Sequence, residues 1–283
     1  MPARSCPTAR QVRLGTELRK LREAVGMSGG AAAAFLGGER SQISHIEAGR
    51  WGVSGERIRR LAAHYSSTDA QLIGALVAMA SERGKGWWEQ YRGALPPGLL
   101  DLSELEHHAT SVRAVEMLAI PGIFQTEAYA RAIFESGNPG IVDDDLEVRI
   151  EHRLARRRIF DVEAPPEFHV VVHEAALRMR YGSRQIVRAQ LESLLEVCDW
   201  PRVTIRVIPF NIDAFIGSAQ SMLYVGGPVP QLDTVHVDAV DEGVFLDAVP
   251  LLEKYRSLFG MVESVSLGAE DSRKFIHRLV EEM

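Results

Sequence analysis

The sequence predicts a multidomain protein with an all-α N-terminal domain and a larger α+β C-terminal domain. Three observations support this prediction. Apolar residues recur at helical spacing through residues 1–66. Dense or alternating β-branched runs begin at residue 167 and are separated by helical segments. Residues 1–66 carry 11 Lys and Arg against 5 Asp and Glu, whereas the whole chain of 283 residues has a net charge of −6.

Four short helices are predicted in the N-terminal domain, residues 1–66. They cover residues 12–24, residues 31–36, residues 41–48 and the segment that follows the cap Ser54. Gly37 and Gly38 end the second helix, because glycine tolerates the left-handed backbone found at helix ends. Two short helices joined by a tight glycine turn match a helix-turn-helix, whose second helix enters the major groove of DNA. A connecting helix is expected within residues 67–86, because Leu72 to Ala80 is apolar.

The second helix of this motif has one apolar and one polar face. Ile43 and Ile46 are three residues apart and are expected to face inward. The candidate DNA-binding residues are Arg40, Ser41, Gln42, Ser44, His45 and Arg50. A bidentate contact from Gln42 to adenine is expected, and His45 either faces a phosphate or packs against the neighbouring helix. A basic N-terminal domain on a remainder of net charge −12 favours double-stranded DNA as the partner.

Two segments of the N-terminal domain resemble the Xre family of helix-turn-helix repressors. They are LGTELRKLREAVGMS, from Leu14 to Ser28, and SQISHIEAGR, from Ser41 to Arg50. Gly29 and Glu39 depart from the family pattern, which commonly has Gln and Ser there. The resemblance implies a DNA-binding transcriptional regulator.

The C-terminal domain, residues 87–283, is predicted to hold about four strands in one sheet flanked by helices. Strands are predicted over residues 167–173, 203–209, 221–225 and 234–240. Helices are predicted over residues 104–119, 126–134, 143–160, 174–179, 186–197, 250–262 and 271–283. Asp143 to Asp145 open the long third helix and Arg156 to Arg158 close it, an order that complements the helix dipole. We expect both charged runs to be solvated. The alternatives are a metal site at Asp143 to Asp145 and contact of Arg156 to Arg158 with an acidic partner.

The segment Pro121 to Ile133, PGIFQTEAYARAI, resembles the signature of the WhiJ-like actinomycete regulators. Further matches, in family order, are Trp87–Trp88, Leu105–Glu106, Glu174–Leu177, Gln190–Leu191 and Val207–Phe210. The resemblance implies a regulator with a large C-terminal domain. It also implies a small BldB-like protein as partner.

Five residues of the C-terminal domain are candidates for binding a ligand or a partner. Gln125, Tyr129 and Arg153 combine amide, phenol and guanidinium groups, which can recognise a polar ligand in a pocket or groove. The alternative is that the PGIFQT segment only breaks one helix and caps the next. Trp87 and Trp88 fit a core anchor or, alternatively, a ligand platform.

No catalytic or metal-binding pattern is recognised, and we expect neither an enzyme nor a cofactor. His173–Glu174 lacks the second histidine of a metalloprotease helix, because position 177 is Leu. Cys6 and Cys198 are the only cysteines, which favours reduced thiols and a cytoplasmic protein. No apolar stretch is long enough to span a bilayer, and no signal peptide is recognised.

These features together predict a cytoplasmic, homodimeric DNA-binding transcriptional regulator. Its C-terminal domain is expected to sense a small partner protein or a ligand. The alternative is an antitoxin-like interaction protein that sequesters a small BldB-like partner, with DNA binding secondary.

Overall fold

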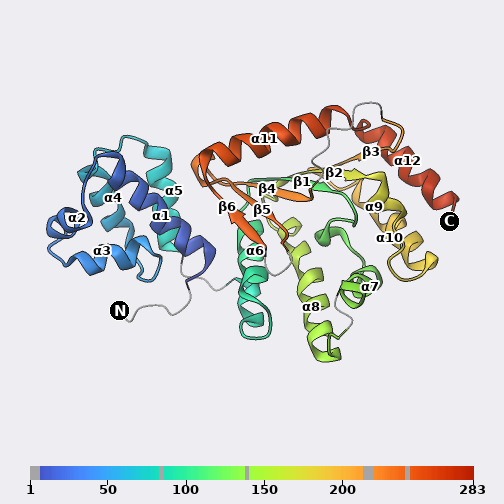
Figure 1. Cartoon of the computed structure of the whole chain (residues 1–283), viewed down its shortest axis with the longest axis horizontal. Helices are drawn as coiled ribbons and strands as arrows, with labels where there is room; N and C mark the ends of the chain where they lie inside the picture. The colour runs from blue at the N-terminus through green and yellow to red at the C-terminus, as the bar shows by residue number, and fades with distance from the viewer. Residues whose placement is uncertain (1–6, 83–85, 138–139, 213–219, 240–242) are drawn as a thin grey trace. The chain divides into compact units, whose positions relative to one another are not determined.

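The computed structural model describes residues 7–82, 86–137, 140–212, 220–239 and 243–283. The chain divides into two compact units (Figure 1). The first unit consists of Met1–Glu89 with Pro228–Leu232, and the second of Gln90–Gly227 with Asp233–Met283. Cys6 lies outside the described residues, and Cys198 is a half-buried free thiol.

The described part of the first unit is helical, as predicted. Its helices are α1 (Ala9–Ala24), α2 (Gly29–Phe35), α3 (Arg40–Glu47), α4 (Gly55–His64) and α5 (Ala70–Ser81), with the 3-10 turn η4 (Pro230–Leu232). Thr8, Ser28, Ser54 and Asp69 each accept a hydrogen bond from a first-turn backbone N–H of the helix that follows. Each bond satisfies one of the donors that a helix start leaves unpaired.

Helices α2 and α3 pack closely through small residues. Ala32 and Ala33 are buried with Ile43, Leu61 and Tyr65 in one cluster. Gly37 has a φ of +68° at the end of α2, a left-handed conformation that favours glycine. The turn between the helices therefore arises where the sequence predicts it.

Helix α1 crosses the end of α3 at a glycine and is held there by an ion pair. A Cβ added to Gly15 would lie 2.5 Å from the carbonyl oxygen of Ile46 and closer still to that of Glu47. Arg22 donates two hydrogen bonds to the Glu47 carboxylate, at 2.6 and 2.8 Å, and a third to the carbonyl oxygen of Met27 at 2.6 Å. One guanidinium thus connects α1, α3 and the turn that leads into α2.

Replacing Gly15 with alanine is expected to destabilise the first unit by about 1–3 kcal/mol, because the new methyl group meets backbone atoms that cannot rotate away. Gly74→Ala is the matched control: its added Cβ on helix α5 would meet nothing within 4 Å, so we expect a gain of up to about 1 kcal/mol. Chemical unfolding of the intact protein followed by far-ultraviolet circular dichroism measures both. Equal stability of the two variants would contradict the close α1–α3 crossing.

A segment from the C-terminal half of the chain completes the core of the first unit. Val229 and Leu232 are buried in one cluster with residues of α1, α3, α4 and α5. The carbonyl oxygen of Gln231 accepts a hydrogen bond from Arg13, and its side-chain amide donates to Asp69 at 2.8 Å. The fold of the first unit therefore depends on residues far away in the sequence.

The second unit is built on a mixed sheet of six strands in its described part, so the prediction of about four strands is wrong in number. The strands are β1 (Ser111–Glu116), β2 (Glu167–His173), β3 (Val203–Ile208), β4 (Met222–Gly226), β5 (Thr234–Val237) and β6 (Val244–Leu246). Their order is β3-β2-β1-β4-β5-β6, with β1, β2 and β3 parallel and the other pairings antiparallel.

Helices cover both faces of this sheet (Figure 1). They are α6 (Pro97–His107), α7 (Glu127–Gly137), α8 (Asp143–Ala155), α9 (Glu174–Arg178), α10 (Arg184–Val197), α11 (Val249–Ser264) and α12 (Ala269–Glu281), with 3-10 helices η2 (Gly122–Phe124) and η3 (Arg156–Phe160). A further 3-10 helix, η1 (Trp87–Tyr91), spans the boundary in the chain between the two units. Phe259 of α11 packs on one face against Val115 and Val171. Helices α10 and α12 contribute Leu191 and Ile276 to the core on the other face.

The predicted helix over residues 104–119 is wrong. The chain instead ends α6 at His107 and enters β1, the central strand. Val112 and Val115 are three residues apart, which fits a helix, but Ala114 pairs with strands on both sides, opposite Val170 and Leu223. Pairing with distant segments therefore overrides the local spacing.

Candidate functional site

The first candidate site is the exposed face of α3. Ile43 and Ile46 are only 2% and 3% exposed, so the opposite side of this helix faces away from the core. Arg40, Ser41 and Ser44 are exposed there. The Ser44 hydroxyl donates to the carbonyl oxygen of Arg40 at 3.3 Å, which leaves its oxygen able to accept a bond. A short polar surface of this kind can approach base edges closely.

Gln42 lies beside this face and contacts a basic residue of α4. With its amide oxygen turned toward Arg57, Gln42 accepts hydrogen bonds from both terminal nitrogens of that guanidinium at 3.0 and 3.2 Å. A Cβ at Gly38 would collide with the Gln42 side chain, so the glycine turn makes room for it. A bidentate contact from Gln42 to adenine would require the amide to leave Arg57.

The remaining sequence candidates differ in exposure. His45 is half-buried and stacks on the ring of Trp51, with ring centroids 4.9 Å apart. Arg50 is exposed directly after α3. Glu39, also exposed, precedes the helix, and its carboxylate accepts a hydrogen bond from Ser41 at 3.4 Å. This carboxylate is a negative charge at the edge of the candidate DNA-binding face.

Removing that charge by Glu39→Gln is expected to tighten DNA binding about two- to five-fold at low salt, because the carboxylate repels phosphates. The gain should shrink as salt is raised. Filter binding at several salt concentrations measures it. The control Glu270→Gln makes the same charge change at an exposed position of α12, and an equal gain there would show that only net charge matters.

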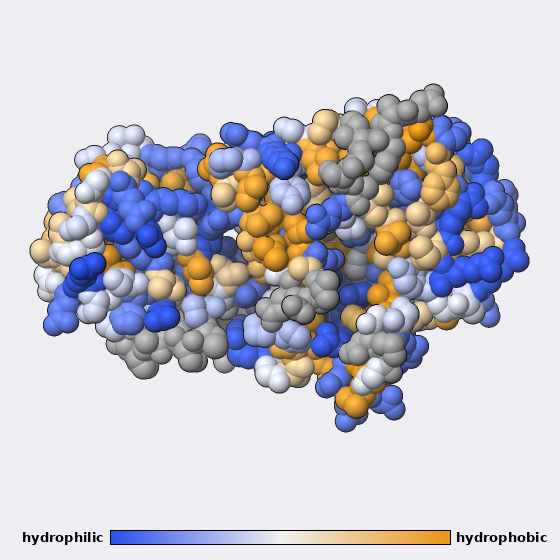
Figure 2. Space-filling view, viewed as in Figure 1, coloured by the Kyte–Doolittle hydropathy of each residue, from blue (hydrophilic) through white to orange (hydrophobic). Residues whose placement is uncertain are grey.

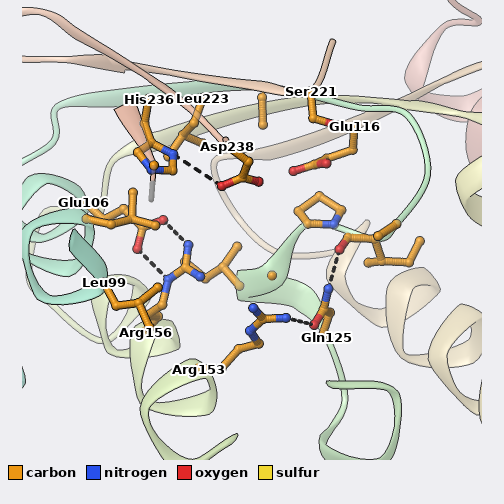
Figure 3. A pocket seen from close by; sticks show the side chains of 18 of the residues that line it. Leu99, Glu106, Glu116, Gln125, Arg153, Arg156, Ser221, Leu223, His236 and Asp238 are labelled. Atoms are coloured by element: carbon orange, nitrogen blue, oxygen red, sulfur yellow. Dashed lines mark hydrogen bonds and ion pairs between the residues drawn. The ribbon is translucent and has the colours of Figure 1, made fainter. Parts of the chain in front are cut away.

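The second candidate site is a cavity of about 420 Å³ inside the second unit (Figure 3). Ala114, Leu223 and His236 form part of its floor and lie side by side on β1, β4 and β5. The walls come from α6, α8, η3 and the segment that contains η2. The charged and polar residues that line it are Glu106, Glu116, Gln125, Arg149, Arg153, Arg156, Ser221, His236 and Asp238.

Three arginines line this cavity from one helical face. Arg149, Arg153 and Arg156 follow each other at intervals of four and three residues along α8 and η3, which places them on the same side of the helix. Arg156 is paired: it donates to both carboxylate oxygens of Glu106, at 2.5 and 2.8 Å. Glu106 is only 1% exposed, so this pair is deeply buried.

Arg153 has neutral partners instead. One of its terminal nitrogens donates to the side-chain oxygen of Gln125 at 2.7 Å, and its guanidinium lies 4.1 Å from the centre of the Phe134 ring. No carboxylate in the described part of the chain forms an ion pair with Arg153 or Arg149. Burial, and then the nearby charge of Arg156, lowers the pKa of Arg153 to about 10.

Acidic and neutral groups lie across the cavity from these arginines (Figure 3). Burial raises the pKa of Glu116 to about 8, although a hydrogen bond with Ser221 opposes this rise. Burial also lowers the pKa of His236, whose ring lies 4.0 Å from the exposed carboxylate of Asp238. At neutral pH, Glu116 is thus mainly protonated and His236 is neutral.

The five candidates from the sequence lie in different places. Gln125 and Arg153 meet in the cavity. Tyr129 is buried, and its hydroxyl accepts a 3.4 Å hydrogen bond from the backbone N–H of Ile120. Trp88 is buried and meets Trp87 edge to face at 5.9 Å in the first unit. Tyr129 and both tryptophans lie outside the cavity lining.

The PGIFQT segment is held by hydrogen bonds around Gln125. The Gln125 amide donates to the carbonyl oxygen of Ile120 at 2.7 Å. Arg157 donates to the carbonyl oxygens of Ile123 and Gln125 at 3.0 and 2.9 Å. The expectation that Arg156 to Arg158 are all solvated is therefore wrong for Arg156 and Arg157, because each bonds to buried groups.

Sequence reasoning missed most of the cavity. The spacing of Arg149, Arg153 and Arg156 was a usable signal, since charged residues at intervals of four and three share a helix face. Glu106 and Glu116 gave no such signal, because only the packing of α6 and β1 brings them to the same cavity.

Comparison with protein families identifies both parts of the chain. Residues 13–72 match a helix-turn-helix domain, and residues 99–278 match a domain of unknown function, DUF5753. The second match covers more than half of the chain, which therefore belongs to the DUF5753 family. No curated protein and no solved structure matches the chain significantly. Within the described residues, no helix combines the length and apolar character needed to cross a membrane.

Proposed function

We propose that this member of the DUF5753 family is a non-catalytic transcriptional regulator that binds DNA through α3 and a small ligand in the cavity of its second unit. The helix-turn-helix domain supports a DNA-binding regulator. The exposed face of α3, opposite the buried Ile43 and Ile46, is the observation on which the DNA-binding role rests. Exposed Arg40 and Arg50 at the ends of this helix supply positive charge for phosphates.

The cavity supports a role in ligand sensing. Its volume of about 420 Å³ falls within the usual range for small-molecule sites. Two of its strands, β4 and β5, are joined by residues 228–232, which belong to the core of the first unit. A ligand that shifts these strands would therefore act on a segment that stabilises the DNA-binding unit.

A small partner protein remains the alternative effector, and the antitoxin-like role the alternative function. The size of the cavity, about 420 Å³, favours a small ligand. We also propose that two copies pair through the second unit, because one module of this size contacts little DNA. The edge strand β6 carries Val244, which is 47% exposed. Figure 2 shows an apolar patch at this end of the sheet.

The DNA-binding role is tested with Ser44→Glu and DNA from immediately upstream of the coding sequence. A carboxylate on the exposed face of α3 should weaken binding at least about ten-fold, because it replaces a groove contact with repulsion from phosphates. Mobility-shift titration measures the affinity, and sedimentation of the same mixtures distinguishes one bound copy from two.

Ser257→Glu is the matched control for this test. Ser257 is an exposed helical serine that, like Ser44, donates to the carbonyl oxygen four residues earlier, here at 2.9 Å. It should bind as the parent does. Equal binding by Ser44→Glu and the parent, or no preference over unrelated DNA, would refute the role of α3.

A further inference from the structure

Among the residues that the structure describes, the charges around the cavity do not balance. Three arginines and three carboxylates line it. Arg156 and Glu106 neutralise each other, and the raised pKa of Glu116 leaves that carboxyl mainly uncharged at neutral pH. Asp238 is 85% exposed at its side chain and well solvated. Arg149 and Arg153 therefore present positive charge to the cavity without a carboxylate partner in the described chain.

An unpaired charge away from bulk water costs free energy, and proteins rarely keep one without a use. The environment of Arg153 positions the charge without neutralising it. Gln125 holds one nitrogen at 2.7 Å, and the Phe134 ring supports the guanidinium from 4.1 Å. Gln125 is itself fixed by the carbonyl oxygen of Ile120. Arg153 is thus held in one orientation, as a residue that recognises an anion must be.

The two inner arginines approach the same glycine. A Cβ at Gly122 would lie 3.0 Å from the terminal nitrogen of Arg156 that does not bond Glu106, and 3.8 Å from Nε and Cζ of Arg153. Both guanidinium groups therefore lie close to one backbone position that has no side chain. Two guanidinium groups that converge can bind the same carboxylate or phosphate group.

The rest of the lining is mostly apolar or neutral. Leu99 and Leu102 of α6 and Ile133 of α7 contribute aliphatic surface. Across from the arginines lie Ser221 and Glu116, whose raised pKa leaves its carboxyl mainly uncharged at neutral pH (Figure 3). This arrangement suits a molecule with one anionic end and a less polar body.

We infer that the cavity binds a small organic anion, with its carboxylate or phosphate held by Arg153, Arg149 and the free nitrogen of Arg156 and its apolar body against α6. This inference rests on the proposed function, since it specifies the ligand of the same cavity. It excludes cations and uncharged molecules of the same size as effectors.

Thermal unfolding of the intact protein tests the ligand class with four probes that share one chain length. The probes are hexanoate, hexyl phosphate, hexylamine and hexanol, at about 10 mM and at constant ionic strength set by sodium chloride. One or both anions should raise the Tm by about 2–4 °C, the shift expected of a millimolar ligand. Hexanoate alone would indicate a carboxylate ligand, and hexyl phosphate a phosphate ligand.

Variants show whether the anion-dependent rise in Tm arises in the cavity. Arg153→Met and, separately, Arg149→Met should reduce or abolish the anion-dependent shift, whereas Arg188→Met, which removes an exposed charge from α10, should retain it. The inference is overturned if neither anion shifts the Tm, if hexanol or hexylamine shifts it equally, or if the shift persists in both cavity variants. DNA binding by the parent in the same buffer shows whether the regulator role survives such a failure.

Discussion

The second unit depends on how three arginines of one helix face are accommodated beside a sheet. Arg156 is neutralised by a buried carboxylate from α6, which fastens η3 to that helix. Arg153 is not neutralised, and is held by an amide and an aromatic ring. The guanidinium groups of Arg149, Arg153 and Arg156 line the cavity beside strands β1, β4 and β5. These charges within the fold give the cavity its chemistry.

A largely buried ion pair also stabilises the first unit, where it fixes the packing of two helices. Arg22 and Glu47 form a bidentate ion pair in which each side chain is about one-tenth exposed. This pair sets the depth at which α3 packs against α1, and the close approach at Gly15 sets the crossing point. The positions of the exposed residues Arg40 and Ser44 follow from this packing, although neither residue takes part in it. In the proposed DNA-binding role, contacts at the surface therefore depend on contacts in the interior.

Much of the fold could be predicted from local pattern, and the errors have physical causes. The helices of the first unit follow from caps and apolar spacing, which are local properties. Strands β2 and β3 were recognised because dense β-branched runs favour a buried strand. The sequence does not predict strand β1, because the spacing of Val112 and Val115 fits a helix and only pairing with β2 and β4 establishes the strand. Strand β6 has three residues, too few to show a period.

The cavity shows the same limit. Gln125 and Arg153 could be singled out because amide and guanidinium groups can recognise a polar ligand, but their contact across 28 residues could not be foreseen. Glu116 lies two residues after Ala114 on β1 and therefore on the same face, so its place in the cavity follows only once β1 is known to be a strand.

If Arg153 serves only a ligand while Arg156 also serves the fold, the two arginines differ in what they contribute to the free energy of unfolding of the ligand-free protein. Chemical unfolding of the intact parent, Arg153→Met and Arg156→Met gives three values under one set of conditions. We expect Arg153→Met to be at least as stable as the parent, because an unpaired charge is replaced by an apolar side chain of similar length. We expect Arg156→Met to be less stable by about 3–5 kcal/mol, because Glu106 is left buried without its partner. Equal destabilisation by both substitutions would rule out a separate ligand-binding role for Arg153, since it would then be as structural as Arg156.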